Sequence, residues 1–208
     1  MNVDSIIFDL DGTLWDPIDS VLLVWNKVLQ DNYANIREFN RKDFSGTMGL
    51  QIQEIGQRLF PDLDEKEQKQ LLDKCCEAES EYLGVNGGQL YDNLEKVLSL
   101  LSQKYKLYIV SNCQAGYIEA FYRFHKLDRF FLDYENPGRT GLSKGENIKL
   151  VMDRNNLISP VYVGDTEGDR KAAMHAGIPF VYAEYGFGEV EDHDYKIEDL
   201  KELLALFG

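Results

Sequence analysis

The sequence predicts an α/β protein with a doubly wound, mainly parallel, Rossmann-like sheet into which a small α-helical domain is inserted. Two observations predict this fold class. Short apolar runs that end in polar residues alternate with amphipathic helical patterns, which is typical of parallel sheets covered by helices. Residues 16–85 carry helical patterns with no strand pattern between them. We therefore assign residues 1–15 and 86–208 to the α/β core domain and residues 16–85 to the insert.

The first predicted strand is the apolar run at residues 6–8, which is followed directly by acidic residues. A continuous apolar run is typical of a strand that is buried on both faces. Asp9 and Asp11 are two residues apart, so an extended backbone directs both side chains to the same side. Gly12 allows a turn in which the backbone approaches a ligand closely. Because open α/β sheets bind ligands at the carboxyl ends of their strands, this position is a candidate ligand site.

The insert is predicted to contain three helices. The first starts after Pro17, where apolar residues recur at three- and four-residue spacing. The second covers residues 50–60 and is ended by Pro61, and the third covers the strongly charged residues 64–82. The glycine-rich residues 84–88 are predicted to be the hinge through which the chain returns to the core.

Beyond this hinge the alternation of helices and strands resumes. Strands are predicted at residues 106–110, 129–132, 160–163 and 180–182. Helices are predicted at residues 90–103, 117–125, 144–155, 167–176 and 196–207. Together with the first strand, these patterns give five strands separated by helices, which predicts a doubly wound and mainly parallel sheet.

Polar residues follow three of the predicted strands and begin one of the helices. They are Asp9 and Asp11 after the first strand, Ser111 and Asn112 after the second, Asp165 and Asp169 after the fourth, and Lys144 at a helix start. Taken singly, such residues are commonly turn residues, helix caps or solvated lysines. Together, carboxylates, a hydroxyl and a lysine at one edge of a sheet predict a site for phosphate held by a hard cation.

The segment Asp9-Leu10-Asp11-Gly12-Thr13-Leu14 resembles the first motif of the haloacid dehalogenase superfamily, in its phosphatase branch. The later polar residues resemble motifs two, three and four in the same order along the chain. Motif three departs from the usual pattern because Lys144 is not followed by proline, and Lys149 or Arg139 could be mistaken for its lysine. We prefer Lys144 because it begins a helix, whose dipole acts on the same anion. Overall, the sequence resembles the phosphoglycolate phosphatase-like group, in which the inserted helical domain is a cap.

This resemblance implies a Mg²⁺-dependent phosphatase that hydrolyses a small-molecule phosphomonoester. Asp9 would attack phosphorus and form an aspartyl-phosphate, while Asp11 would act first as general acid and then as general base. The implied metal ligands are Asp9, Asp11 through its backbone carbonyl, Asp165, and Asp169 in an outer position. The implied phosphate-binding groups are the Ser111 hydroxyl, the Asn112 backbone N–H and Lys144.

Two alternatives to a phosphatase stay open. A phosphosugar mutase of the same superfamily shares the aspartates but must keep water away from its aspartyl-phosphate. A non-catalytic regulatory protein would retain the fold and use Mg²⁺-dependent phosphate binding as a signal. The intact pair Asp9 and Asp11 argues against loss of catalysis.

The insert offers two kinds of residue that could select the substrate. The loop residues Gly46, Thr47, Met48 and Gly49 are the best candidates for contact with the leaving group, although a plain connection between helices explains them equally well. Four basic residues of the insert could pair with an anionic leaving group: Arg37, Arg41, Lys42 and Arg58.

Composition restricts the partners of the protein. The formal net charge is -14, which argues against nucleic acid and against anionic membranes because both bind basic surfaces. Three cysteines offer no disulfide framework, so we expect reduced thiols and a cytoplasmic location. The expected partner is a small phosphorylated substrate, and the expected assembly is a monomer or small homo-oligomer.

Overall fold

The computed structural model describes residues 3–33 and 35–207. Its main sheet has six strands in the order β5-β4-β1-β6-β7-β8, and every neighbouring pair is parallel. The strands are β1 (Ser5–Phe8), β4 (Lys106–Val110), β5 (Asp133–Glu135), β6 (Pro160–Gly164), β7 (Phe180–Ala183) and β8 (Tyr195–Ile197). The chain extends the sheet from β1 in both directions, which confirms the predicted doubly wound parallel sheet.

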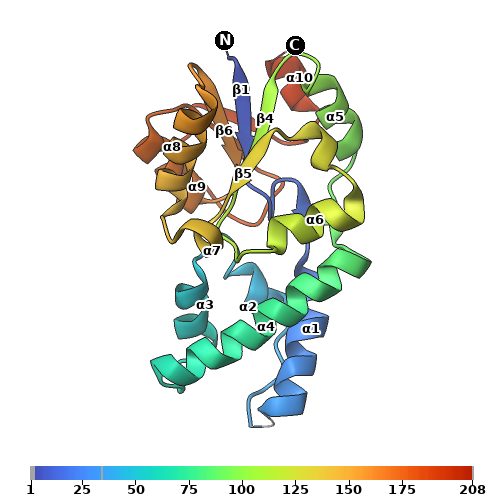
Figure 1. The fold of residues 1–208 in the computed structure, drawn as a ribbon, viewed down its shortest axis with the longest axis vertical. Coiled ribbons are helices and arrows are strands. Elements are labelled where there is room, and N and C mark those ends of the chain that lie inside the picture. Colours follow the sequence, from blue (N-terminus) through green and yellow to red (C-terminus); the bar gives the residue numbers. More distant parts are fainter. Residues whose placement is uncertain (1–2, 34, 208) are drawn as a thin grey trace.

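Helices cover both faces of this sheet, because alternate residues of a strand point to opposite faces. Ile6 and Phe8 belong to the core under one group of helices, and Ile7 belongs to the core under the other. The first group is α5 (Leu94–Leu101), α6 (Tyr117–His125) and α10 (Glu202–Leu206), and the second is α8 (Lys144–Asn155) and α9 (Glu167–Ala176). Figure 1 shows the two groups on opposite sides of β1.

Four helices form a separate layer at the end of the sheet away from the chain termini (Figure 1). They are α1 (Ile18–Asn32), α2 (Arg41–Ser45), α3 (Ile52–Leu59) and α4 (Glu65–Asn86), and we call them the cap helices. Aromatic rings fill their interior: the ring centroids of Trp25 and Phe44 are 5.0 Å apart, and those of Phe39 and Phe60 are 5.5 Å apart. Helix α2 was not predicted, because five residues are too few to show a helical period.

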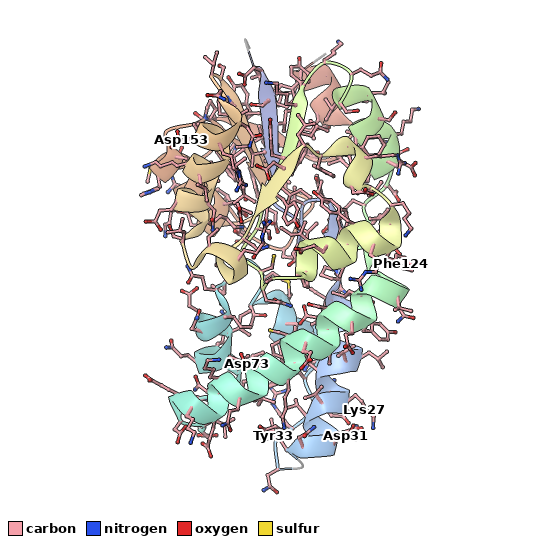
Figure 2. The ribbon with its side chains drawn as sticks, in the orientation of Figure 1. Lys27, Asp31, Tyr33, Asp73, Phe124 and Asp153 are labelled. Atoms are coloured by element: carbon pink, nitrogen blue, oxygen red, sulfur yellow. The ribbon has the colours of Figure 1, made fainter. Side chains whose placement is uncertain are left out.

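A short antiparallel ribbon of β2 (Trp15–Asp16) and β3 (Gln89–Leu90) joins the cap helices to the sheet domain. The predicted hinge at residues 84–88 is wrong in its first part, because α4 continues through the first three of these residues. Helix α4 stays regular here since it packs against α6. It ends at Gly87, whose φ of +70° favours glycine, and the ring of Phe124 from α6 lies against this residue (Figure 2).

Two element boundaries in the middle of the chain also differ from the prediction. Helix α5 begins four residues later than expected, because Leu90 pairs with Trp15 in the ribbon. The strand expected at residues 129–132 forms further along the chain, as β5 at Asp133–Glu135. Its place is taken by a 3₁₀ helix, Asp128–Phe130, which lets Phe131 pack edge-on against Phe8 with ring centroids 6.3 Å apart.

The closing helix predicted at residues 196–207 is largely wrong. Residues Tyr195–Ile197 form the edge strand β8, which pairs with β7, and only Glu202–Leu206 form a helix. The buried side chains of this segment recur at three- and four-residue spacing, as they would in one helix, although they come from an edge strand followed by a short helix; they are Ile197, Leu200, Leu203 and Phe207. Another short helix, α7 (Pro137–Thr140), was not predicted. Within the described residues, no helix has both the length and the apolar composition that spanning a membrane requires.

Candidate active site

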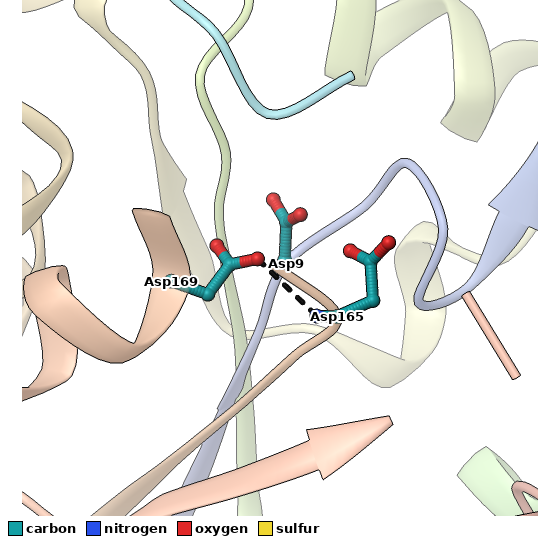
Figure 3. Close-up of side chains that lie close together, drawn as sticks. All are labelled: Asp9, Asp165 and Asp169. Atoms are coloured by element: carbon teal, nitrogen blue, oxygen red, sulfur yellow. Dashed lines mark hydrogen bonds between the residues drawn. The ribbon is translucent and has the colours of Figure 1, made fainter. Parts of the chain in front are cut away.

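Three aspartates meet where β1 and β6 end. Phe8 pairs with Ile109 of β4 and with Val163 of β6, so the residues that follow these strands reach the same edge of the sheet. Asp9, Asp165 and Asp169 are buried there, and each offers a carboxylate oxygen within 4.8 Å of the other two. Figure 3 shows them together, with the backbone N–H of Asp165 donating to Oδ2 of Asp169 at 3.2 Å. The structure therefore brings three of the predicted metal-site residues into one cluster.

Lys144 supplies the positive charge of this cluster. Its Nζ donates to Oδ1 of Asp9 at 2.9 Å and to Oδ1 of Asp169 at 2.6 Å, and only 4% of its side chain is exposed. Lys144 is the first residue of α8, which Ser143 caps by accepting from the N–H of Glu146. The other two candidates lie outside the cluster, since Lys149 and Arg139 are both exposed. Of the three cations considered, Lys144 fits the role.

Burial raises the pKa of two aspartates of the cluster, Asp9 and Asp165. The pKa of Asp9 is raised to about 6, first by burial and then by the charge of Asp169, and Lys144 and Ser111 oppose this rise. The pKa of Asp165 lies well above its ordinary value for the same reasons, burial first and the charge of Asp169 second. A cluster of buried carboxylates with a single lysine is thus short of positive charge, which a bound cation would supply.

One carboxylate oxygen of Asp165 is available as a metal ligand. Its Oδ2 accepts from the N–H of Phe187 at 2.7 Å, but its buried Oδ1 has no hydrogen-bond partner among the described residues. Gly12 and Gly186 make room for this carboxylate: a Cβ on Gly12, where φ is +82°, would lie 2.1 Å from Oδ2. An orphaned buried oxygen beside two further carboxylates is a donor set that fits Mg²⁺.

Asp11 lies beside the cluster and faces the cap helices. Its Oδ1 accepts from Nε1 of Trp15 at 2.6 Å and from the hydroxyl of Tyr117 at 3.0 Å. Its pKa is raised to about 7, chiefly by burial and next by the charge of Asp9. A carboxyl group with a pKa near neutrality can both donate and accept a proton, as the predicted acid and base role requires. Its side chain is not one of the three that cluster, and the expected metal contact through its backbone carbonyl stays a prediction.

Ser111 and Asn112 follow β4 at the same edge of the sheet. Ser111 is buried, and its hydroxyl group lowers the pKa of the Asp9 carboxyl group by hydrogen bonding. The Asn112 side chain makes a contact that the sequence did not indicate. Its Nδ2 donates to the carbonyl oxygen of Gly49 at 2.9 Å, and this bond ties residues 46–49, which we call the cap loop, to the sheet. Its Oδ1 is buried and has no partner in the described part of the chain.

The predicted cap loop divides into two parts. Thr47, Met48 and Gly49 line a cavity of about 50 Å³ together with Asp11, so they lie between the cap helices and the edge of the sheet that carries the aspartates. Gly46 does not line this cavity and lies against the guanidinium of Arg58 instead. Three of the four loop residues therefore lie beside Asp11, and a contact between this loop and a leaving group stays a prediction.

Glu79 is the residue of this region that sequence reasoning missed. It comes from the middle of α4, is only 6% exposed and lines the same cavity as Asp11. Its Oε2 accepts from Nε1 of Trp25 at 2.6 Å. A signal for it was present, because Glu79 continues the spacing of Leu72 and Cys75 and is therefore a carboxyl on an apolar stripe.

Comparison with known proteins gives one family. Similar proteins include the phosphoglycolate phosphatase of Synechococcus elongatus, which is 27% identical over 90% of this chain and 86% of its own length. They also include the pyrophosphatase PpaX of Bacillus cereus, 22% identical over 99% of this chain and 97% of its own length.

Solved structures show the same fold. A predicted phosphoglycolate phosphatase from Haemophilus somnus matches with a TM-score of 0.87 at 23% identity, over 100% of this chain and 99% of that one. The magnesium-bound HAD-hydrolase YfnB of Bacillus subtilis matches with a TM-score of 0.75 at 21% identity, over 100% of both chains. The family model described as haloacid dehalogenase-like hydrolase matches residues 6–183, and the chain therefore belongs to the haloacid dehalogenase-like hydrolase family.

Proposed function

We propose that this protein is a Mg²⁺-dependent phosphatase that hydrolyses a small-molecule phosphomonoester through an aspartyl-phosphate on Asp9. The observation that carries the proposal is the position of the Asp9 carboxylate, which is buried at the end of β1 between Lys144 and two further carboxylates. The relatives named phosphoglycolate phosphatase and pyrophosphatase act on phosphate bonds by their names, which supports the same class of reaction here.

The metal site is assigned to the acidic residues that follow β1 and β6 at one edge of the sheet. Asp9 and Asp165 would bind Mg²⁺ with their side chains and Asp11 with its backbone carbonyl, while Asp169 would act from an outer position by holding Lys144. Once bound, the ion would neutralise charge on the phosphoryl oxygens and so allow a carboxylate to approach them. The orphaned Oδ1 of Asp165 supports this assignment.

The chain itself supplies the remaining chemistry. Asp9 attacks phosphorus in line with the leaving oxygen, and the ester bond breaks as the phosphorus–carboxylate bond forms. Lys144, the Ser111 hydroxyl and the Asn112 backbone N–H donate hydrogen bonds to the phosphoryl oxygens. Asp11 gives its proton to the leaving alcohol, and as a carboxylate it then takes a proton from the water that cleaves the aspartyl-phosphate.

Residues 16–85 are proposed to form the cap domain that closes over the leaving group. The contact between Asn112 and Gly49 supports this assignment, because it seats the cap loop on the catalytic edge of the sheet. Closure of this kind removes water from the site and strengthens each hydrogen bond and charge interaction within it.

Phosphate release is the direct test. A panel of phosphomonoesters and pyrophosphate is incubated with the protein in Mg²⁺ or in EDTA, and the Asp9→Asn variant serves as the blank. We expect Mg²⁺-dependent release by the wild type, none by Asp9→Asn, and slow phosphorylation without efficient release by Asp11→Asn. Equal phosphorylation of wild type and Asp9→Asn would overturn the nucleophile assignment. Transfer of phosphate between hexose phosphates in place of release would favour the mutase alternative.

A further inference from the structure

The cavity beside Asp11 is where a leaving group would lie, because Asp11 is the proposed acid that protonates it. Its wall comes from all four cap helices, the cap loop, the segment after β4 and the first residue of α6, and most of its lining side chains are apolar. A volume of about 50 Å³ holds on the order of three to five water-sized groups, so the enclosed space suits a leaving group of a few heavy atoms. The adjoining cleft of about 220 Å³ shares Asn112 and Gln114 with this cavity and opens toward the segment before α8.

The charged residues that line this cavity are acidic. They are Asp11 and Glu79, and among the described residues neither the cavity nor the adjoining cleft is lined by lysine or arginine. The negative charge of Asp11 is one cause of the raised pKa of Glu79, although burial is the larger cause. The wall therefore favours a positively charged ligand group and disfavours a negatively charged one.

The four basic residues that could have paired with an anionic leaving group either pair with other carboxylates or lie outside this cavity. Arg37 forms a two-pronged pair with Asp43 at 2.8 Å, and Arg41 pairs with Asp16 and Asp19. Lys42 and Arg58 line a separate hollow on the outer part of the cap together with Arg37. The expectation that one of these residues pairs with an anionic leaving group finds no support in their positions.

Other groups in the cavity also match a cation. Asn112 lines the cavity, and its buried Oδ1 has no partner in the described part of the chain, so this oxygen is an acceptor available to a ligand. The aromatic side chains of Trp25 and Tyr117 form part of the wall, and aromatic rings attract ammonium groups. A carboxyl, an orphaned acceptor and two aromatic side chains together provide what a buried ammonium group requires.

We propose that the leaving group of the substrate carries an ammonium group, so that the substrate is the phosphate ester of a short amino alcohol and Glu79 is its counter-ion. This inference rests on the proposed phosphatase function. It separates this chain from relatives named for phosphoglycolate and pyrophosphate, whose leaving groups are anionic. An anion in this cavity would meet two carboxyl groups and no lysine or arginine among the lining residues.

Three two-carbon substrates that differ mainly in charge test the inference. They are phosphoethanolamine, 2-hydroxyethyl phosphate and 2-phosphoglycolate, whose leaving groups are cationic, neutral and anionic. We measure kcat/KM for each at pH 7.5 with Mg²⁺. The expected order is cationic, then neutral, then anionic, with steps on the order of tenfold, because a buried charge pair at an effective dielectric constant near 20 has an effect of at least this size.

The Glu79→Gln variant tests the named counter-ion. Glutamine keeps the acceptor for Trp25 but, unlike Glu79, cannot ionise when an ammonium group enters the cavity, so the preference for phosphoethanolamine over 2-hydroxyethyl phosphate should fall by about tenfold. Glu77→Gln is the matched control, because Glu77 is exposed on the same helix, and it should keep the wild-type preference.

The outcomes separate this inference from the proposed function. Release from the neutral or anionic ester at a rate equal to or above that from phosphoethanolamine overturns the ammonium inference and leaves the phosphatase intact. An unchanged preference in Glu79→Gln overturns the role of Glu79. Absence of Mg²⁺-dependent release from every phosphate ester, in a protein that is folded by circular dichroism, overturns both.

Discussion

Replacing Glu79 by glutamine is expected to change how folding stability depends on pH. The pKa of Glu79 is raised from its ordinary value of 4.5 to about 8, chiefly by burial, while the hydrogen bond from Trp25 opposes the rise. The folded protein therefore keeps the Glu79 proton between pH 4.5 and pH 8, where the unfolded chain has released it. Stability from this group is fully present below pH 4.5 and is lost as the pH rises through 8.

The size of the effect follows from the pKa values. At about 1.4 kcal/mol per pKa unit, ionisation of Glu79 costs about 5 kcal/mol more in the folded protein than in the unfolded chain. Between pH 5 and pH 7 the free energy of unfolding of the wild type should lose about 2.5 kcal/mol through this group. Glutamine does not titrate, so the Glu79→Gln variant should lack this part of the pH dependence.

Urea denaturation measures the difference. We measure urea unfolding curves at pH 5, 6 and 7 for the wild type, Glu79→Gln and the exposed control Glu77→Gln. EDTA is present, so metal binding does not contribute to stability. With a urea m-value of about 2 kcal/mol/M, the midpoint of Glu79→Gln relative to wild type should rise by about 1 M between pH 5 and pH 7. A midpoint difference that stays constant over this range would show that Glu79 ionises normally, and the reasoning from its burial would be wrong.

Three further predictions concern the catalytic edge. Lys144→Ala should remove nearly all phosphatase activity while Lys149→Ala retains most of it, since Lys144 contacts Asp9 and Lys149 is exposed; steady-state kinetics that show the reverse would move motif three. Gly12→Ala should weaken Mg²⁺ binding at least tenfold in calorimetric titrations, because the new Cβ would lie 2.1 Å from Oδ2 of Asp165; wild-type affinity would contradict this contact. In EDTA, Asp165→Asn should melt several degrees above wild type because a buried carboxylate is lost, and its Tm should no longer rise with Mg²⁺. If Mg²⁺ raised the Tm of wild type and of Asp165→Asn equally, Asp165 would be excluded as a metal ligand.

The sequence could predict that Asp9, Asp165 and Lys144 meet at one edge of the sheet, because local patterns and sheet topology together determine where they lie. Each short apolar run indicates a buried strand, and the carboxyl ends of parallel strands lie at the same edge of the sheet. Asp9, Ser111 and Asp165 are far apart in the chain, but β1 pairs with both β4 and β6. Lys144 could be chosen over Lys149 because the helix start is marked by the cap at Ser143.

The sequence could not predict features that depend on tertiary pairing. Strand β8 forms because Tyr195 and its neighbours hydrogen-bond to β7, and nothing in residues 195–197 distinguishes this edge strand from a helix start. The C-terminal end of α4 could not be predicted for the same reason: its glycine-rich segment stays helical because it packs against α6. Local preference was overridden by contacts in both places.

Glu79 shows how a site residue can be recognised before its ligand is known. It stands on the apolar stripe of α4 between Cys75 and Leu83, where a leucine would add buried apolar surface and an ionised carboxyl is costly. The hydrogen bond from Trp25 satisfies one oxygen but supplies no positive charge, and burial still raises the pKa to about 8. The fold alone therefore gives no reason for a carboxyl at this position. A cationic group that enters the cavity would lower the pKa of Glu79 and recover part of the desolvation cost, so substrate binding and ionisation of Glu79 should favour each other.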